Sequence, residues 1–216
     1  MRIDEYLSRI DYPGRIIAAG TGKDGEAVLC YAITGRSANS RNRVLRLEDG
    51  VLRTKPFDES KVEDPSLIIY NALRVKDGAV ILTNGDQTDT IYDSETLEEA
   101  LLKRTYEPDE PNCTPRISLV YGEDGYTLSI IRKKDGEADR RIFSYKKEPG
   151  TGHIIHTYMG NGSPLPSFDG LPGRIELPDS IEELSDELHS GISGSCRISQ
   201  YVRYGGSEMI INDQEA

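Results

Sequence analysis

The sequence of 216 residues is poor in cysteine and in long apolar runs. No stretch approaches the roughly 18 consecutive apolar residues of a membrane-spanning helix, which argues against a membrane protein. The three cysteines, Cys30, Cys113 and Cys196, are scattered and lack CxxC spacing, so neither a disulfide framework nor structural zinc is expected. Residues 1–6 carry an acidic pair where a signal peptide would be apolar. We therefore expect a cytoplasmic protein.

Basic residues and histidines are also scarce. Lysine and arginine number 26 against 37 acidic residues, which gives a net charge of -11. A chain this acidic repels nucleic acid and anionic membranes, so neither is expected as a partner. Of the three histidines, His153 and His156 lie three residues apart on a predicted strand and would point to opposite faces. With no third ligand at a recognisable spacing, we expect no metal site.

Turn-forming dipeptides are the most frequent local signal. Asp-Gly occurs at 24–25, 49–50, 77–78, 124–125, 135–136 and 169–170, and Asn-Gly at 84–85 and 161–162. These pairs supply the positive φ angles of tight hairpin turns. Apolar and β-branched stretches between them predict an antiparallel, meander-like protein with strands at 14–20, 27–34, 66–75, 79–83, 116–121, 126–132, 141–146, 153–159 and 196–204.

Two amphipathic segments with acidic or hydroxyl residues at their starts predict helices at 94–104 and 179–189, and a short third helix is expected at 3–10. Each is too short to be stable alone and must lie on a sheet. Few helices and many hairpins indicate an α+β fold with helices outside stacked antiparallel sheets. The proline-containing stretch 160–173 is interpreted as a long loop, so we expect a single domain over residues 1–216.

Familiar catalytic motifs are absent or out of context. Residues 20–25 match GxGxxG, but strands are predicted on both sides, whereas a dinucleotide site needs a following helix. A hairpin turn is therefore expected there. Lys23 is followed by Asp24, which breaks the phosphate-loop pattern, and no GxSxG is found. The chain also has no N-terminal Ser, Thr or Cys that could act as a nucleophile.

One segment is basic although the chain as a whole is acidic. Between residues 36 and 55, two acidic residues face six basic ones: Arg36, Arg41, Arg43, Arg46, Arg53 and Lys55. Arginine forks match phosphate and carboxylate oxygens, so this island suits an anionic small ligand. A solvated hairpin paired with neighbouring acids explains the same composition. The polar turn 84–89 also has two interpretations: its side chains could bind a ligand, or they could cap the segment that follows.

Taken together, several short pieces in order resemble the archaeal-type IMP cyclohydrolase family. They are Gly14-Arg15, Arg36-Ser37 followed by Arg41, Tyr70-Asn71, Asn84-Gly85 with Thr88-Asp89, Tyr106-Glu107 and Thr114-Pro115-Arg116-Ile117. The resemblance is strongest over residues 13–132. It implies closure of the purine ring of IMP from 5-formamidoimidazole-4-carboxamide ribonucleotide (FAICAR). It also implies a four-layer α-β-β-α sandwich like that of N-terminal-nucleophile hydrolases, without the processed nucleophile, and a nucleotide pocket between the sheets.

The resemblance assigns roles to particular residues. Glu107 is expected to be the base or proton shuttle, Arg41 to stabilise the developing oxyanion, and Tyr70 to donate to the formyl oxygen. Substrate-binding positions are Arg15, Arg36 and Arg116 for the phosphate, Asn84, Thr88 and Asp89 for base or ribose, and the matching motif residues Ser37 and Asn71. The chemistry requires no cofactor and no metal, and a purine ribonucleotide is the expected small-molecule partner.

The chain departs from the family pattern in three places, one of which is the loop between Tyr106 and Arg116, longer here by one residue. Ala32 follows Tyr31 where the family has an arginine, and residues 38–41 read Ala-Asn-Ser-Arg in place of Phe-Pro-Asn-Arg. Arg15 or Arg43 is a candidate replacement. Three alternatives stay open: an inactive nucleotide-binding homologue, a hydrolase of another amide, and an interaction module. A homo-oligomer is also left open, as is a lid formed by residues 150–173 whose histidines reach the substrate.

Overall fold

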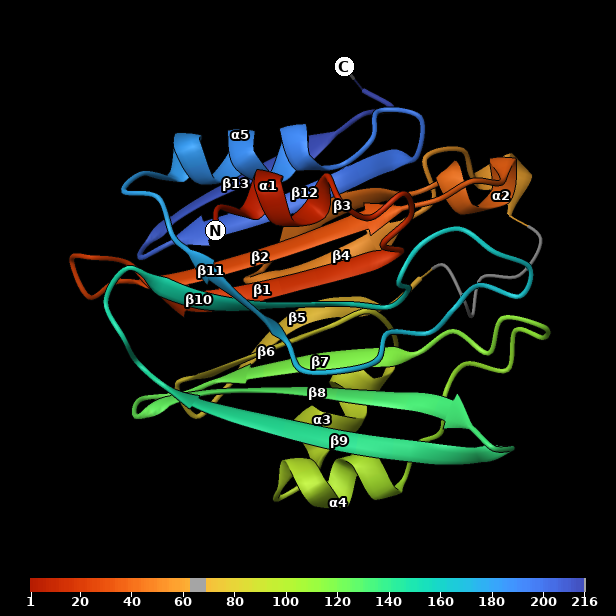
Figure 1. Ribbon diagram of the computed structural model, residues 1–216, viewed down its shortest axis with the longest axis horizontal. Helices are drawn as coiled ribbons and strands as arrows, with labels where there is room; N and C mark the ends of the chain where they lie inside the picture. Colours follow the sequence, from red (N-terminus) through yellow and green to blue (C-terminus); the bar gives the residue numbers. More distant parts are fainter. Residues whose placement is uncertain (63–68, 216) are drawn as a thin grey trace.

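The computed structural model describes residues 1–62 and 69–215 and contains two antiparallel sheets (Figure 1). The six-stranded sheet has the order β11-β10-β1-β2-β12-β13, formed by Gly173–Glu176, Thr151–His156, Arg15–Thr21, Ala27–Thr34, Arg197–Tyr204 and Ser207–Asn212. The seven-stranded sheet runs in chain order from β3 to β9, formed by Val44–Glu48, Val51–Lys55, Asn71–Lys76, Ala79–Thr83, Arg116–Tyr121, Gly125–Lys134 and Glu137–Lys146.

Helices cover the outer faces of both sheets. Helices α1 (Ile3–Leu7) and α5 (Ile181–Gly191) lie on the six-stranded sheet, whereas α3 (Gln87–Asp93) and α4 (Leu97–Leu102) lie on the seven-stranded sheet (Figure 1). One further short helix, α2 (Ala38–Arg41), follows β2, and a 3-10 turn spans Glu59–Lys61. The predicted α+β fold with helices outside stacked antiparallel sheets is therefore confirmed. The likeness to N-terminal-nucleophile hydrolases stays a prediction.

Three apolar clusters separate these layers. The largest fills the space between the two sheets and includes Ile17, Leu29, Leu82 and Leu128. A second cluster packs α1 and α5 on the six-stranded sheet, and a third, smaller one packs α3 and α4 on the seven-stranded sheet. Each fully buried aliphatic side chain contributes about 1.5–3 kcal/mol of transfer free energy. The central cluster therefore holds the sheets face to face and sets the distance between the loops at the ends of their strands.

Five of the six Asp-Gly pairs lie at turns between neighbouring strands, whereas Asp169-Gly170, Asn84-Gly85 and Asn161-Gly162 lie in other loops. Asp49, Asp77 and Asp135 have φ angles of 53°, 50° and 52°, and the glycine after each also has a positive φ. Two successive left-handed residues give the turn that matches the twist of the strands it joins. The GxGxxG stretch at 20–25 lies in the β1–β2 hairpin, where the Gly22 amide donates to the Glu26 carbonyl at 2.8 Å. It is a turn, as predicted.

The element boundaries differ from the prediction where polar residues form helices and edge strands. Helix α3 lies in the stretch expected to be a turn, and Ser94, the predicted start of the next helix, is instead the residue that ends α3. Thr96 caps α4 by accepting from the Glu99 amide at 3.1 Å. The sequence reasoning missed helix α2 and the strands β11 and β13. Strands β3 and β4 form the hairpin that was one of the two interpretations of residues 36–55, and Arg46, Arg53 and Lys55 pair there with acidic residues. Residues 66–68 of the predicted strand 66–75 lie outside the described residues.

Residues 160–173 are a long connection between β10 and β11, as predicted. This loop is tied to the seven-stranded sheet, because Arg132 on β8 donates to the Phe168 carbonyl at 2.9 Å and pairs with Asp169 at 3.0 Å. Within the described part of the chain, no helix is long and apolar enough to cross a membrane.

Candidate active site

A polar cavity of about 340 Å³ lies at one end of the two sheets. Because neighbouring strands are antiparallel, the ends of β2, β6 and β10 meet the starts of β1, β3 and β7 there. The loops at these strand ends supply the lining residues Tyr12, Arg15, Arg36, Ser37, Asn39, Ser40, Arg43, Asn84, Glu107, Asp109, Asn112, Thr114, Tyr158 and Leu165. The volume is within the range of small-molecule sites.

Glu107 is the carboxyl group with the most perturbed environment in the cavity. It lies in the loop before β7, where its amide donates to the Thr114 carbonyl at 2.9 Å, and 15% of its side chain is exposed. Burial raises the pKa of Glu107 to about 7, although Arg116 and Arg15 oppose this shift. Its closest ion-pair contact is with Arg116, at 3.9 Å. A carboxyl with a pKa near 7 can both accept and return a proton at neutral pH.

Two arginines, the half-buried Arg15 and the buried Arg43, share the cavity with Glu107. Arg15 Nη1 donates to the Thr34 carbonyl at 2.8 Å, but the Nε atoms of both arginines are buried without a hydrogen-bond partner among the described residues. Burial, and next the like charge of Arg15, lower the pKa of Arg43 to about 10. Buried guanidinium donors normally have partners. This pair is therefore suited to an anionic or strongly polarised oxygen.

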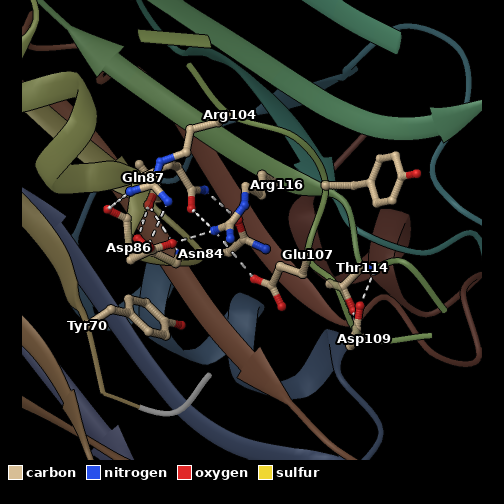
Figure 2. Close-up of polar contacts among 12 residues, drawn as sticks. Tyr70, Asn84, Asp86, Gln87, Arg104, Glu107, Asp109, Thr114 and Arg116 are labelled. Carbon is tan, nitrogen blue, oxygen red and sulfur yellow. Dashed lines mark hydrogen bonds and ion pairs between the residues drawn. The ribbon is translucent and has the colours of Figure 1, made fainter. Parts of the chain in front are cut away.

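Arg116 contacts the Glu107 carboxylate and is not one of the residues that line the cavity. Its Nη1 pairs with Asp86 at 2.7 Å and donates to Gln87 Oε1 at 2.8 Å, and its Nε donates to the Thr105 carbonyl at 3.0 Å (Figure 2). Asp86 is shared with Arg104, whose Nη1 lies 2.8 Å away. With its donors engaged in this way, Arg116 positions the loop that carries Glu107. Arg116 does not line the cavity with Arg15 and Arg36, the other two residues expected to bind phosphate.

Gly85 allows this close packing. A Cβ at this position would lie 2.6 Å from Gln87 Oε1, 2.8 Å from Arg116 Nη1 and 3.2 Å from Glu107 Oε1. Asn84 beside it lines the cavity, but its amide accepts from the Ile117 and Gln87 nitrogens and donates to the Pro115 carbonyl, all at 2.8–2.9 Å. Asn84 therefore joins β6 to β7 beneath the site.

Three residues expected to bind substrate lie elsewhere. Asn71 Nδ2 donates to the Asp89 carboxylate at 3.0 Å, Arg74 pairs with the same carboxylate at 2.7 Å, and Thr88 Oγ1 bonds to Thr83 Oγ1 at 2.7 Å. None of Asn71, Thr88 and Asp89 lines the cavity. The physical reason is that α3 forms in the stretch expected to be a turn, which directs these side chains to β5 and β6.

The arginine expected to stabilise the oxyanion is also displaced. Arg41 ends the single-turn helix α2, and its Nη1 donates to the Ser195 carbonyl at 2.7 Å, outside the cavity lining. Arg43, two residues later in the sequence, lines the cavity instead. Arg36 and Ser37 do line the cavity: the Arg36 guanidinium lies 4.8 Å from the centroid of the Tyr12 ring, and Ser37 caps α2.

Tyr70 lies next to the site without lining the cavity. It is buried, and its hydroxyl is 2.6 Å from that of Tyr31 in the core between the sheets. Ala32, which replaces the family arginine, packs in the apolar cluster under α1 and α5, on the opposite face of β2 from Tyr31. A side chain at position 32 therefore does not reach the cavity from this strand.

The histidines do not reach the cavity either. His153 Nδ1 lies 2.8 Å from the Tyr126 hydroxyl and its ring stacks on Tyr145, whereas His156 Nε2 lies 3.1 Å from the Tyr6 hydroxyl. Of the segment 150–173, Tyr158 and Leu165 line the cavity instead. Among the described residues, no group of three or more His, Cys, Asp and Glu could hold a metal ion.

Sequence reasoning missed several lining residues, notably Tyr12, Asp109 and Tyr158. The rings of Tyr12 and Tyr158 stack with centroids 5.9 Å apart and planes at 18°. Thr114, which hydrogen-bonds to both Asp109 and Tyr158, lies in the Thr-Pro-Arg piece that sequence inspection singled out. Tyr158 lies 44 residues after Thr114 in sequence, so no local spacing could have connected the two.

Comparison with known proteins identifies the family. The family model described as IMP cyclohydrolase-like protein matches residues 12–205. The chain belongs to the IMP cyclohydrolase-like family. The match extends well beyond residue 132, where the recognisable motifs end. It also includes every residue that lines the cavity, from Tyr12 to Leu165.

Curated relatives in this family come from archaea. The chain is 32% identical over 179 residues to the IMP cyclohydrolase of Methanopyrus kandleri, covering 79% of this chain and 85% of the relative. It is 28% identical to the enzyme of Methanococcus aeolicus, with 68% and 74% coverage. It is 25% identical to that of Methanocaldococcus jannaschii, with 68% and 73% coverage.

Proposed function

We propose that this protein is an IMP cyclohydrolase that converts FAICAR to IMP and water, with a purine ribonucleotide as its substrate and the cytoplasm as its compartment. Membership of the IMP cyclohydrolase-like family and several relatives with that name support the activity. The observation that carries the site assignment is Glu107, with 15% of its side chain exposed and its pKa raised to about 7, in one cavity with Arg15 and Arg43, whose Nε atoms have no partner among the described residues.

At the formyl carbon, the reaction forms a new C–N bond, converts the existing C–N bond into C=N, and removes the oxygen of the C=O group as water. The carboxamide nitrogen attacks the formyl carbon, and Glu107 accepts the proton that this nitrogen loses. Glu107 returns this proton to the formyl oxygen, which becomes the hydroxyl of a carbinolamine. Glu107 then accepts the proton of the former formamide nitrogen and passes it to this hydroxyl, so that water leaves as the C=N bond forms. A single carboxyl can serve both steps because its pKa lies near the working pH.

Arg15 and Arg43 stabilise the oxygen of the formyl group as it becomes negative. Both line the cavity with Glu107, and each guanidinium carries further N–H donors besides its buried Nε. Prearranged donors aimed at a developing oxyanion, in a site with little water, lower the barrier by several kcal/mol. This assignment gives the Arg15–Arg43 pair the role that the sequence resemblance gave to Arg41.

Arg36 and Ser37 contact the 5′-phosphate at the exposed rim of the cavity. Both are exposed, unlike Arg43, and they lie in the loop that follows β2. Arginine and hydroxyl donors suit phosphate oxygens. Holding the nucleotide at both ends brings the carboxamide and formyl groups into near-attack geometry, which is worth several kcal/mol in an intramolecular reaction.

An assay of FAICAR conversion tests the proposal. Purified protein is mixed with FAICAR in buffer containing EDTA, and IMP formation is followed by absorbance. We expect turnover, together with a rise in melting temperature when IMP is added. No turnover, with IMP still raising the melting temperature, would contradict the activity and identify an inactive nucleotide-binding homologue. Ala32 gives no reason to favour that alternative, because its side chain packs away from the cavity.

A further inference from the structure

A chain of three hydrogen-bonded side chains forms one wall of the cavity. The Thr114 amide donates to Asp109 Oδ1 at 2.6 Å, the Thr114 hydroxyl donates to Asp109 Oδ2, and Thr114 Oγ1 lies 2.5 Å from the Tyr158 hydroxyl (the Asp109–Thr114 contact is drawn in Figure 2). All three residues line the cavity. They connect the loop before β7 with the end of β10, so the two sheets are joined here by polar contacts.

The direction of these hydrogen bonds follows from the chemistry of the groups. An ionised carboxylate only accepts, and it is met here by both the amide and the hydroxyl of Thr114. The single hydroxyl proton of Thr114 is therefore committed to Asp109. Thr114 Oγ1 can then only accept from Tyr158, whose own proton is used in that contact. Tyr158 is left with oxygen lone pairs and no proton to offer.

Tyr158 is rigidly held in this state. Its side chain is 4% exposed, its ring stacks on Tyr12, and burial raises its pKa, which keeps the hydroxyl neutral. Among the described residues, its oxygen has no hydrogen-bond partner besides Thr114. The other cavity groups that reach inward from β1 and the β2–β3 connection are mostly donors, notably Arg15, Arg36 and Arg43. Tyr158 on the opposite wall offers an acceptor, which these arginines cannot do, so it requires a hydrogen-bond donor on the ligand.

We infer that Asp109 and Thr114 set Tyr158 as a hydrogen-bond acceptor that selects a donor group of the bound purine ribonucleotide, either a ribose hydroxyl or an N–H of the base. This inference rests on the proposed function for the identity of the ligand. Tyr158 is the group that contacts the ligand, and Asp109 and Thr114 are positioning residues that act through it.

The Asp109→Asn variant reverses the direction of the hydrogen bonds from position 109 through Thr114 to Tyr158, with a side chain of nearly the same shape. The Thr114 amide still needs an acceptor, so the carbonyl oxygen of the new side chain faces this amide, and the new NH₂ group faces Thr114 Oγ1 and donates to it. The Thr114 proton is then directed to Tyr158, and the Tyr158 proton turns into the cavity. The variant thus presents a donor to the ligand donor, whereas Tyr158→Phe presents nothing.

Calorimetric binding of IMP, 2′-deoxy-IMP, 3′-deoxy-IMP and 1-methyl-IMP tests the inference. We expect Tyr158→Phe to weaken IMP binding about tenfold, and Asp109→Asn to weaken it at least as much. The analogue that lacks the selected donor should bind wild type and Tyr158→Phe within about twofold of each other, which identifies the donor. Thr114→Ser keeps the hydroxyl and should bind IMP like wild type.

Tyr126→Phe is the matched control, because it also removes a buried tyrosine hydroxyl with a polar partner, His153, but outside the cavity lining. Thermal unfolding of each variant checks that it is folded. If wild type binds IMP but Tyr158→Phe and Asp109→Asn bind it equally well, the inference is overturned and the proposed function stands. Equal losses for IMP and all three analogues also overturn it. If wild type does not bind IMP, the proposed function itself fails.

Discussion

Two groups of polar residues, each with at least one member at a position that the family pattern matches, differ in how many of their hydrogen-bonding atoms have partners. Beside α3, the side chains of Asn71 and Arg74 both bind the Asp89 carboxylate, at 3.0 and 2.7 Å. In the cavity, the Nε atoms of Arg15 and Arg43 are buried without a hydrogen-bond partner among the described residues. The first group satisfies its own polar atoms, whereas the second leaves buried donors without partners beside a cavity.

This difference separates stabilising polar residues from functional ones. A buried polar group without a partner costs about 1–3 kcal/mol, so a folded chain rarely leaves several in one place. The cavity does so, and it adds a buried carboxyl, Glu107, beside the two arginines. Local rules of polar satisfaction are typically broken at functional sites. Motif position alone could not make this distinction.

The largest effect is expected for Glu107→Gln. Removing the group that accepts and returns the proton should lower kcat for FAICAR by about 10²–10⁴-fold. The amide is nearly the same size, so the affinity for IMP should change little. Steady-state kinetics and calorimetry of the same preparation measure both quantities. Loss of IMP binding along with turnover would show that Glu107 maintains the cavity and does not act in the chemistry.

Arg43→Met should have the next largest effect. Losing one donor to the oxyanion is expected to lower kcat by about 10²–10³-fold. Arg41→Met is the matched control, because the Arg41 guanidinium lies on the Ser195 carbonyl outside the cavity. We expect its kcat to stay close to the wild-type value. A larger loss for Arg41→Met than for Arg43→Met would return the oxyanion role to Arg41.

The buried carboxyl should also be visible in stability. Because the pKa of Glu107 is raised to about 7 in the folded protein, the folded state holds a proton that the unfolded state loses at about pH 4–5. Its contribution therefore destabilises the protein as pH rises towards 7. Between pH 5 and 8, Glu107→Gln should gain roughly 2 kcal/mol in unfolding free energy relative to wild type. Urea unfolding at several pH values measures this difference, and a constant difference would contradict the raised pKa.

The smallest effect is expected beside α3. Asp89→Asn weakens a contact with Arg74 in which the aspartate side chain is 42% exposed, so the loss in unfolding free energy should be at most about 1 kcal/mol. The kinetic constants for FAICAR should be unchanged, since Asp89 does not line the cavity. Thermal unfolding and the FAICAR assay check both statements. A substantial rise in KM would place Asp89 at the substrate after all.

The layers of the fold could be predicted from the sequence because their signals are local. Asp-Gly turns such as Asp77-Gly78, with positive φ at both residues, fixed the hairpins. Strand β2 has the predicted bounds, Ala27–Thr34. Helix α3 was missed because its residues Gln87–Asp93 are mostly polar and show no apolar stripe. It is stabilised by packing on β5 and β6, which is a tertiary effect.

The site was only partly predictable because several of its side chains are placed by tertiary contacts and not by local sequence signals. Glu107 and Arg15 match motif pieces and line the cavity. The direction of Arg41 depends on α2, a single turn whose Ser37 cap is visible only in the structure. Tyr158 comes from the segment that matches the motifs poorly, and it reaches the cavity because β10 pairs with β1. Such long-range pairing is invisible to a reading of spacings along the chain.

The pH dependence of kcat/KM for FAICAR tests the central claim most directly, namely that burial tunes Glu107 as the base. The base must be ionised to accept the carboxamide proton, so kcat/KM should rise with pH and reach half of its maximum near pH 7, the pKa of Glu107 in the folded protein. A half-maximum near pH 4–5, the range of an ordinary glutamate, or a flat profile from pH 5 to 9, would contradict the claim.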